Sequence, residues 1–157
     1  MLFRSVSDAS VIEILSDKKK TTDYLRKANI PVLPTLSPDQ IGEKNYPVIT
    51  KSHKGFGGKG ISILRTASEW NKWKEANNAD EFLLQPFLEN MTEYSADFAI
   101  DFSSQVSDVN LRIRLRQSGG FATVMTFAND GKLNELVSED RKSTRVNSSH
   151  TVISYAV

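Results

Sequence analysis

The stretch KSHKGFGGKGISIL, Lys51 to Leu64, places four of the chain's eight glycines within six consecutive positions, with Lys59 inside the run. Glycine has no Cβ, so the backbone can turn sharply and its N–H groups can approach a bound anion closely. A basic, glycine-rich loop is therefore suited to holding phosphate groups. The same pattern also fits the tip of a flexible hairpin whose lysines are simply solvated.

Composition limits the possible functions. The chain has 157 residues, of which 39% are hydrophobic and 25% charged, as in a soluble globular domain or part of a larger one. A net charge of +1 argues against nucleic-acid or membrane binding through bulk charge, so we expect neither partner. The absence of cysteine excludes disulfides and thiolate metal sites. No apolar run reaches about 18 residues and no signal peptide is recognisable, so we expect a cytoplasmic protein.

The last stretch, DRKSTRVNSSHTVISYAV, differs abruptly in composition. It resembles the translation of a common sequencing-library adapter over Asp140–His150, with Val146 in place of a leucine, and again over Ile153–Val157. We therefore expect residues 140–157 to be a non-functional tail, as a fusion scar would be. The authentic sequence is then expected to be cut off near Glu139.

Apolar spacing and capping residues predict the order of the elements. Asp17 is expected to cap a helix, and Thr66 or Ser68 another, in which Trp70 and Trp73 share one face. We expect this face to pack in the core or the lid rather than to hold a ligand. The first helix is expected around the apolar residues 11–15, with Ser7 or Asp8 as its N-cap, the second over residues 18–28, and the third within residues 66–79. Strands are expected near 46–51, 61–65, 81–87, 93–102, 108–116 and 121–127. Pro86 indicates that its strand lies at an edge or hinge. The last three strands are expected to be successive and antiparallel, with Gly119 and Gly120 in a turn. Helices combined with antiparallel strands indicate an α+β fold class.

The glycine loop matches no common phosphate-binding fingerprint completely. Gly55, Gly57 and Gly60 spell G-x-G-x-x-G, but a strand follows where a dinucleotide-binding fold has a helix. The Walker A ending is absent because Lys59 precedes Gly60. A strand–loop–strand flap over the phosphates of a nucleotide fits better. Protein kinases have such a flap, but this chain has Ser62 in place of the kinase valine and lacks the kinase catalytic segments.

Three segments stand in the order and spacing of an ATP-grasp ligase. They are IEILSDKKKTTDYLRKANIPVLPT, PVITKSHKGFGGKGISIL and FLLQPFLENMTEYSADFAID. The chain resembles the carbamoyl-phosphate synthetase large subunit and biotin carboxylase in particular, and RIRLRQSGG is similar to the strand and turn that follow in the former. The resemblance covers residues 9–137. It implies an incomplete ATP-grasp fold, with a small β-hairpin/helix lid subdomain and part of an antiparallel-sheet subdomain.

The same resemblance divides the chain into four segments. Residues 1–45 are expected to hold the end of a leading domain and the first helical segment of the ATP-grasp fold. Residues 46–90 form the lid subdomain with its glycine flap, and residues 91–139 begin a truncated C-terminal subdomain. Residues 140–157 are the adapter-derived tail.

The resemblance also assigns roles to the flap and its surroundings. Lys51 matches the lysine that reaches the α- and β-phosphates, and Lys18 matches a basic residue that contacts the nucleotide from the first subdomain. The flap that closes over the phosphates corresponds to Gly55, Gly57, Gly58, Lys59 and Gly60. Each lysine could instead be a solvated surface side chain.

A second set of residues matches the adenosine site of the family. The hinge strand that holds adenine through backbone groups corresponds to Gln85, Pro86, Phe87 and Leu88. Gln85 stands where glutamate is more common, but its amide oxygen can still accept a hydrogen bond from the adenine amine. Glu93 matches the acidic residue that binds the ribose hydroxyls, although an ordinary surface glutamate would fit the same position.

Arg114 matches a basic residue near the γ-phosphate or acyl phosphate, and it is the residue expected to be catalytic. Alternation places Arg112, Arg114 and Arg116 on one face of their strand. A stripe of like charges is costly to bury unless an anion meets it.

The function implied by the resemblance is the ATP-binding portion of an ATP-dependent carboxylate ligase acting through an acyl phosphate. The expected cofactors are ATP and Mg²⁺, and the partners are ATP, an unidentified carboxylate and, for the full-length protein, a further copy of itself. The magnesium ligands, a glutamate and a Glu-x-Asn pair, should lie beyond Glu139, so the chain alone is expected to be inactive. The alternatives are a non-catalytic nucleotide- or phosphate-binding module and a purely structural α+β domain.

Overall fold

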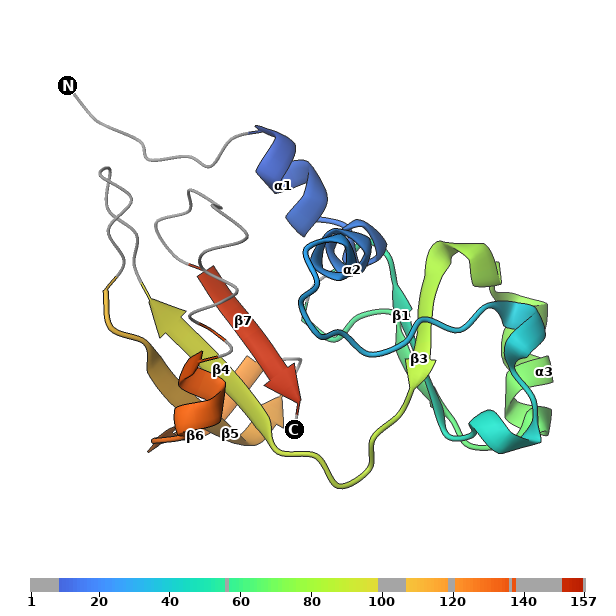
Figure 1. Cartoon of the computed structure of the whole chain (residues 1–157). Coiled ribbons are helices and arrows are strands. Elements are labelled where there is room, and N and C mark those ends of the chain that lie inside the picture. Colours follow the sequence, from blue (N-terminus) through green and yellow to red (C-terminus); the bar gives the residue numbers. More distant parts are fainter. Residues whose placement is uncertain are drawn as a thin grey trace. The chain divides into compact units, whose positions relative to one another are not determined.

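The computed structural model describes residues 9–55, 57–98, 107–118, 121–135, 137 and 151–156. The chain divides into two compact units, shown in Figure 1. We call Ile14–Asn90 the hairpin unit, and Met1–Glu13 with Met91–Val157 the four-stranded unit. The roles expected for segments 1–45, 46–90, 91–139 and 140–157 remain predictions.

The helices form where capping and apolar spacing predict them. They are α1 (Ala9–Leu15), α2 (Lys18–Lys27) and α3 (Ala67–Ala76), with short 3₁₀ helices at Pro38–Gln40, Glu43–Asn45 and Ala79–Glu81. Asn29 follows α2 with a φ of 58°, the left-handed conformation that commonly ends a helix. The residues expected to cap α1, Ser7 and Asp8, lie outside the described residues.

The hairpin unit contains a three-stranded antiparallel sheet of order β2-β1-β3. Its strands are β1 (Val48–Ser52), β2 (Ile61–Leu64) and β3 (Phe82–Pro86). Pro86 ends β3, an edge strand, so the prediction made from this proline is confirmed.

One face of this sheet packs against α3. Trp70, Leu64 and Leu84 form its buried centre, and each is 6% exposed or less. Trp70 stacks on Trp73 at a centroid distance of 5.5 Å, and Trp73 meets the edge of Phe82 at 4.8 Å. The predicted core role of both tryptophans is confirmed.

Thr66 holds the first turn of α3, because its side-chain oxygen accepts a hydrogen bond from Glu69 N at 3.2 Å. We expect Thr66→Ala to lower the free energy of unfolding of the hairpin unit by about 1 kcal/mol, the usual contribution of an N-cap. Urea unfolding followed by tryptophan fluorescence measures this unit alone, since both tryptophans lie in α3. Ser68→Ala, at an exposed position in the same turn, should change little. Equal losses in the two variants would contradict the cap.

The four-stranded unit has a second antiparallel sheet, of order β6-β5-β4-β7. Its strands are β4 (Glu93–Phe98), β5 (Asn110–Ser118), β6 (Phe121–Ala128) and β7 (Thr151–Ala156). The prediction of three successive antiparallel strands is confirmed by β4, β5 and β6. The turn expected at Gly119 and Gly120 lies outside the described residues.

The core of this unit lies on one face of its sheet. Ala96 and Leu111 pack there with Leu133, from the helical residues 131–135, and with Val137. The tail contributes β7, whose residues pair with β4 from Glu93↔Ala156 to Phe98↔Thr151. The tail thus supplies a strand to the sheet, and its lack of function remains a prediction.

Candidate functional site

The glycine loop connects β1 to β2 and closes on itself at its base. Gly60 has a φ of 69°, and its carbonyl accepts a hydrogen bond from Ser52 N at 2.9 Å. A Cβ added to Gly60 would lie 2.9 Å from the Cβ of Ser52, so the closure requires glycine. Gly55, Gly57 and Gly58 also have positive φ. The loop is the strand–loop–strand flap that the sequence predicts.

Lys18 contacts this flap directly. Its backbone N–H donates to His53 O at 2.9 Å, and its Nζ donates to Gly55 O at 2.8 Å. The Asp17 side chain fixes the start of α2 by accepting hydrogen bonds from Lys19 N and Lys20 N at 2.9 and 3.1 Å. The cap therefore places Lys18, a predicted site residue, against the glycine flap.

The Asp17 cap is sensitive to pH. Burial raises the pKa of this carboxyl, but the hydrogen bonds from Lys20 N and Lys19 N lower it more, so the pKa lies below the ordinary 3.8. A depressed folded-state pKa stabilises the fold above the unfolded-state pKa, and this contribution is lost as the pH falls through the folded-state pKa. Asn also caps helices well, so Asp17→Asn removes the charge and keeps the cap.

We expect the wild type to melt at a higher temperature than Asp17→Asn at pH 7. The difference should disappear as the pH is lowered below 3.8, the ordinary pKa of the group. Circular dichroism melts over this range measure it. A difference that grows on acidification would contradict the assignment.

Lys51 and Gln85 lie together on the sheet face opposite α3. Lys51 Nζ donates to Gln85 Oε1 at 3.1 Å, and Gln85 Nε2 donates to Leu33 O at 3.4 Å. Gln85 is buried, with only 5% of the residue exposed. The carbonyl of Leu33 thus orients the amide with its oxygen toward the lysine.

Antiparallel pairing identifies the other residues on this face. Ile49 lies opposite Ile63 and Gln85, and Lys51 lies opposite Ile61 and Leu83. We call these six residues the isoleucine face. Ile61 and Ile63 are 42% and 40% exposed, so the face offers apolar surface beside a cationic amine and a buried amide.

Of the four hinge residues, Gln85 and Pro86 lie in β3, and Phe87 and Leu88 follow it. Phe87 N donates to Pro47 O at 2.8 Å, so this N–H is already used within the chain. The Arg65 guanidinium lies 5.9 Å from the centre of the Phe87 ring and pairs with Glu89. Leu88 is 38% exposed. A backbone contact to adenine from Pro86, Phe87 or Leu88 remains a prediction, and the Phe87 N–H is occupied.

Glu93 and Arg114 belong to the four-stranded unit, where they form an ion pair across β4 and β5. Their side chains are 20% and 13% exposed, respectively. Arg112 pairs in the same way with Asp97. Carboxylates of β4 thus pair with two arginines of the expected stripe. A bulge between Arg114 and Arg116 interrupts the alternation of side chains along β5. The ribose role of Glu93 and the catalytic role of Arg114 remain predictions.

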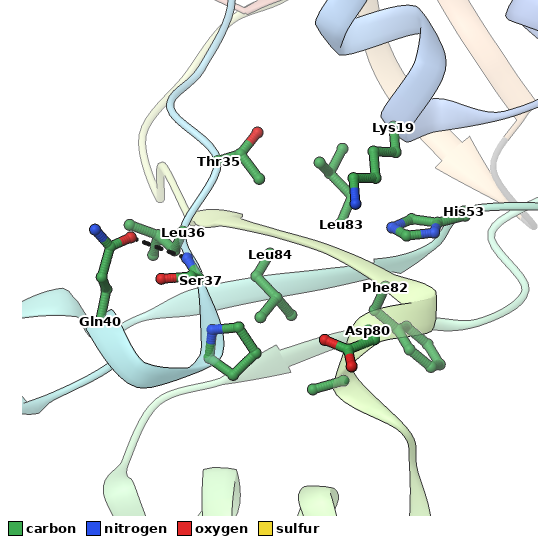
Figure 2. Close-up of a pocket in the computed structure, with 12 residues that line it drawn as sticks. Lys19, Thr35, Leu36, Ser37, Gln40, His53, Asp80, Phe82, Leu83 and Leu84 are labelled. Carbon is green, nitrogen blue, oxygen red and sulfur yellow. Dashed lines mark hydrogen bonds between the residues drawn. The ribbon is translucent and has the colours of Figure 1, made fainter.

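Sequence reasoning missed a cavity of about 370 Å³ in the hairpin unit. It lies beside β3, and Figure 2 shows its lining. Its lining comes from α2, from residues 35–40, from His53 and from residues 79–84, and includes none of the predicted site residues. In the sequence, Lys19 follows Lys18 and His53 lies two residues after Lys51. No known sequence motif links these two positions to each other.

No metal centre is found in the part of the chain that the structure describes, where no group of three or more His, Asp or Glu side chains could hold an ion. The expected magnesium ligands concern residues beyond Glu139 and remain a prediction. None of the helices in the described ranges has the length and hydropathy of a membrane span.

The strand–loop–strand arrangement of the glycine loop and the two antiparallel sheets are consistent with the family resemblance drawn from the sequence. The sequence matches the ATP-grasp domain over residues 15–147. This chain belongs to the ATP-grasp family. The resemblance drawn from the glycine loop and its flanking motifs is thereby confirmed.

Two curated relatives match about half of the chain. Pyruvate carboxylase of Bacillus subtilis (strain 168) is 33% identical over 96 residues, covering 50% of this chain and 8% of that protein. The 2-oxoglutarate carboxylase small subunit of Hydrogenobacter thermophilus is 29% identical over 97 residues, covering 51% of this chain and 21% of that protein. The chain therefore matches less than a quarter of the length of either relative.

Solved structures confirm the fold as part of an ATP-grasp domain. Biotin carboxylase from Campylobacter jejuni, in a β,γ-ATP complex, has a TM-score of 0.80 at 19% identity, covering 96% of this chain and 39% of that one. The biotin carboxylase domain of the Hydrogenobacter thermophilus enzyme, bound to MgADP, ADP and bicarbonate, has a TM-score of 0.78 at 21% identity. It covers 96% of this chain and 38% of that one.

Proposed function

We propose that this chain is the ATP-binding portion of an ATP-dependent carboxylate ligase that acts through an acyl phosphate. The observation that carries the proposal is the arrangement of Lys51 and Gln85 on an exposed apolar face, at the base of a glycine flap that Lys18 contacts. The relatives are named as carboxylases, and two of the similar structures hold adenine nucleotides.

The isoleucine face fits a nucleotide chemically. Ile49, Ile61 and Ile63 offer an apolar surface on which a purine ring can lie. The oxygen of Gln85 accepts a hydrogen bond from an exocyclic amine, as adenine carries and as guanine does not at the same position. Lys51 supplies positive charge for the phosphates, and the flap supplies backbone N–H groups.

The described residues contain no group of three or more His, Asp or Glu side chains that could hold a metal ion. Phosphoryl transfer to a carboxylate depends on metal ions that bridge the phosphates and neutralise charge. We therefore assign nucleotide binding to this chain and catalysis to the full-length protein. The acceptor carboxylate, Mg²⁺ and any homo-oligomer belong to that longer protein.

The binding part of the proposal is tested by thermal unfolding with and without ATP. A ligand that binds only the folded state at 100 times its Kd stabilises it by about 2.7 kcal/mol. We expect ATP to raise the melting temperature of the hairpin unit, and tripolyphosphate and GTP to raise it less. Equal shifts with tripolyphosphate would indicate a phosphate module, and no shift with any of them would indicate a structural domain.

The chain by itself is expected to release no ADP from ATP in the presence of bicarbonate, because its described residues contain no group of three or more His, Asp or Glu side chains that could hold a metal ion. A coupled pyruvate kinase assay with Mg²⁺ measures this, and full-length biotin carboxylase serves as the positive control. Sustained ADP release that scales with chain concentration would contradict the assignment of catalysis to the missing part.

A non-catalytic nucleotide-binding module is the second candidate. It is favoured by the ion pair between Glu93 and Arg114. These two predicted site residues bind each other in the structure. The coding sequence downstream of Glu139 discriminates the two functions. A glutamate followed by a Glu-x-Asn pair supports the ligase, and their absence supports the module.

A further inference from the structure

The cavity beside β3 shares only Leu83 with the isoleucine face. We call it the edge pocket, because it lies at β3, where Leu36 N donates to Leu84 O at 2.8 Å. Its volume of about 370 Å³ lies at the lower end of the range for small-molecule sites, which begins near about 300 Å³. Lys18, Lys51 and Gln85 do not line it, and their side chains bond elsewhere.

Three charged or ionisable side chains from separate elements line the edge pocket. Lys19 comes from the first turn of α2, His53 follows β1, and Asp80 lies in the 3₁₀ helix before β3. Figure 2 shows Lys19 and His53 on one side of the opening and Ser37 with Gln40 on the other. The pocket thus offers two hydrogen-bond donors for an anion and one carboxylate for a cation.

The floor of the edge pocket is apolar. Leu84 is 1% exposed and Leu83 is 4% exposed, and both line the cavity with Leu36 and Phe82. A ligand that is only an anion would leave Asp80 as a repulsive neighbour, and a triphosphate would meet it with several charges. A molecule with one positive group, one negative group and a small apolar body matches the whole lining.

We propose that the edge pocket binds a small zwitterion of amino-acid size. Its carboxylate lies at Lys19 and His53, its ammonium group lies at Asp80, and its aliphatic side chain contacts Leu84. Charge-assisted hydrogen bonds at both ends give selectivity over molecules that carry only one of the two charges.

His53, which lines the pocket and precedes the glycine loop, is held by two backbone hydrogen bonds. His53 N donates to Glu81 O and His53 O accepts from Lys18 N, each at 2.9 Å. A ligand that holds His53 therefore stabilises the base of the flap and the position of Lys18. Zwitterion binding itself does not rest on the proposed function.

Isothermal titration of the full chain with L-leucine, without nucleotide, tests the proposal. The matched probes are 4-methylpentanoate, which lacks the ammonium group, and 3-methylbutylamine, which lacks the carboxylate. We expect leucine to bind at least about tenfold more tightly than either, as loss of one charge-assisted hydrogen bond predicts. Equal binding of 4-methylpentanoate, or no leucine binding at millimolar concentration, overturns the proposal.

Variants locate the binding. Lys19→Met and Asp80→Asn should each weaken leucine binding about tenfold. The matched controls Lys27→Met and Glu75→Gln, at exposed positions outside the pocket, should not. Lys19 and Asp80 are both exposed, so we expect neither substitution to change the melting temperature. An unchanged melting temperature then shows that the variant is folded. Leucine binding that is unaffected by Lys19→Met and Asp80→Asn also overturns the proposal.

Discussion

Gly60→Ala is expected to lower the free energy of unfolding of the hairpin unit by about 3 kcal/mol. A residue with a side chain costs about 1–2 kcal/mol in the left-handed region, and Gly60 has a φ of 69°. The new Cβ would also meet the Cβ of Ser52 at 2.9 Å, and such overpacking typically costs a further 1–3 kcal/mol, about as much again. The β1–β2 hairpin and its flap would both be displaced.

Urea unfolding followed by tryptophan fluorescence measures this change, because Trp70 and Trp73 report on the hairpin unit. Gly42→Ala is the matched control, since Gly42 has a φ of −139° and a Cβ there meets only Asn45 Oδ1 at 3.9 Å. We expect the control to change stability by less than about 1 kcal/mol. A Gly60→Ala variant as stable as Gly42→Ala would show that the flap does not close as described.

Lys51→Met is expected to weaken ATP binding at least tenfold and to leave the fold intact. The methionine keeps the length and apolar stem of the side chain but removes the charge that the phosphates require. A hydrogen bond to a charged group contributes about 1.5–3 kcal/mol, which corresponds to about tenfold to a hundredfold in affinity. Gln85 Oε1 also loses its donor, so a small loss of stability should accompany the change.

Isothermal titration with ATP measures the affinity, and tryptophan fluorescence verifies folding in the same samples. Lys72→Met removes the same charge at an exposed position in α3 and is expected to bind ATP normally. Equal affinity in the two variants would remove Lys51 from the nucleotide site.

Local chemistry made much of the fold predictable. Asp17 and Thr66 cap their helices as expected, because a cap depends on residues within three or four positions. The prediction of a strand–loop–strand arrangement is also correct, because β-branched residues that favour strands flank Gly55–Gly60 on both sides. The elements of the hairpin unit thus follow from short-range patterns.

Long-range partners were not predictable from those patterns. Alternation places Arg112 and Arg114 on one face, but only the β4–β5 register reveals that Asp97 and Glu93 meet them. The hydrogen bond between Lys51 and Gln85 likewise depends on the pairing of β1 with β3.

The edge pocket was missed for the same reason. Lys19, His53 and Asp80 come from three distant segments, and no residue spacing connects them. The strand formed by Thr151–Ala156 was not expected either, since the composition of the tail indicated no partner for it.

The central claim is that ATP lies on the isoleucine face under the glycine flap. An NMR titration of the ¹⁵N-labelled chain with ATP tests it most directly. If ATP binds there, the amide signals of Lys51, Gly57, Gly60, Ile61 and Gln85 are expected to shift together, and those of α3 are expected to stay unchanged. Shifts confined to α3 or to the edge pocket, or no shifts at all, would contradict it.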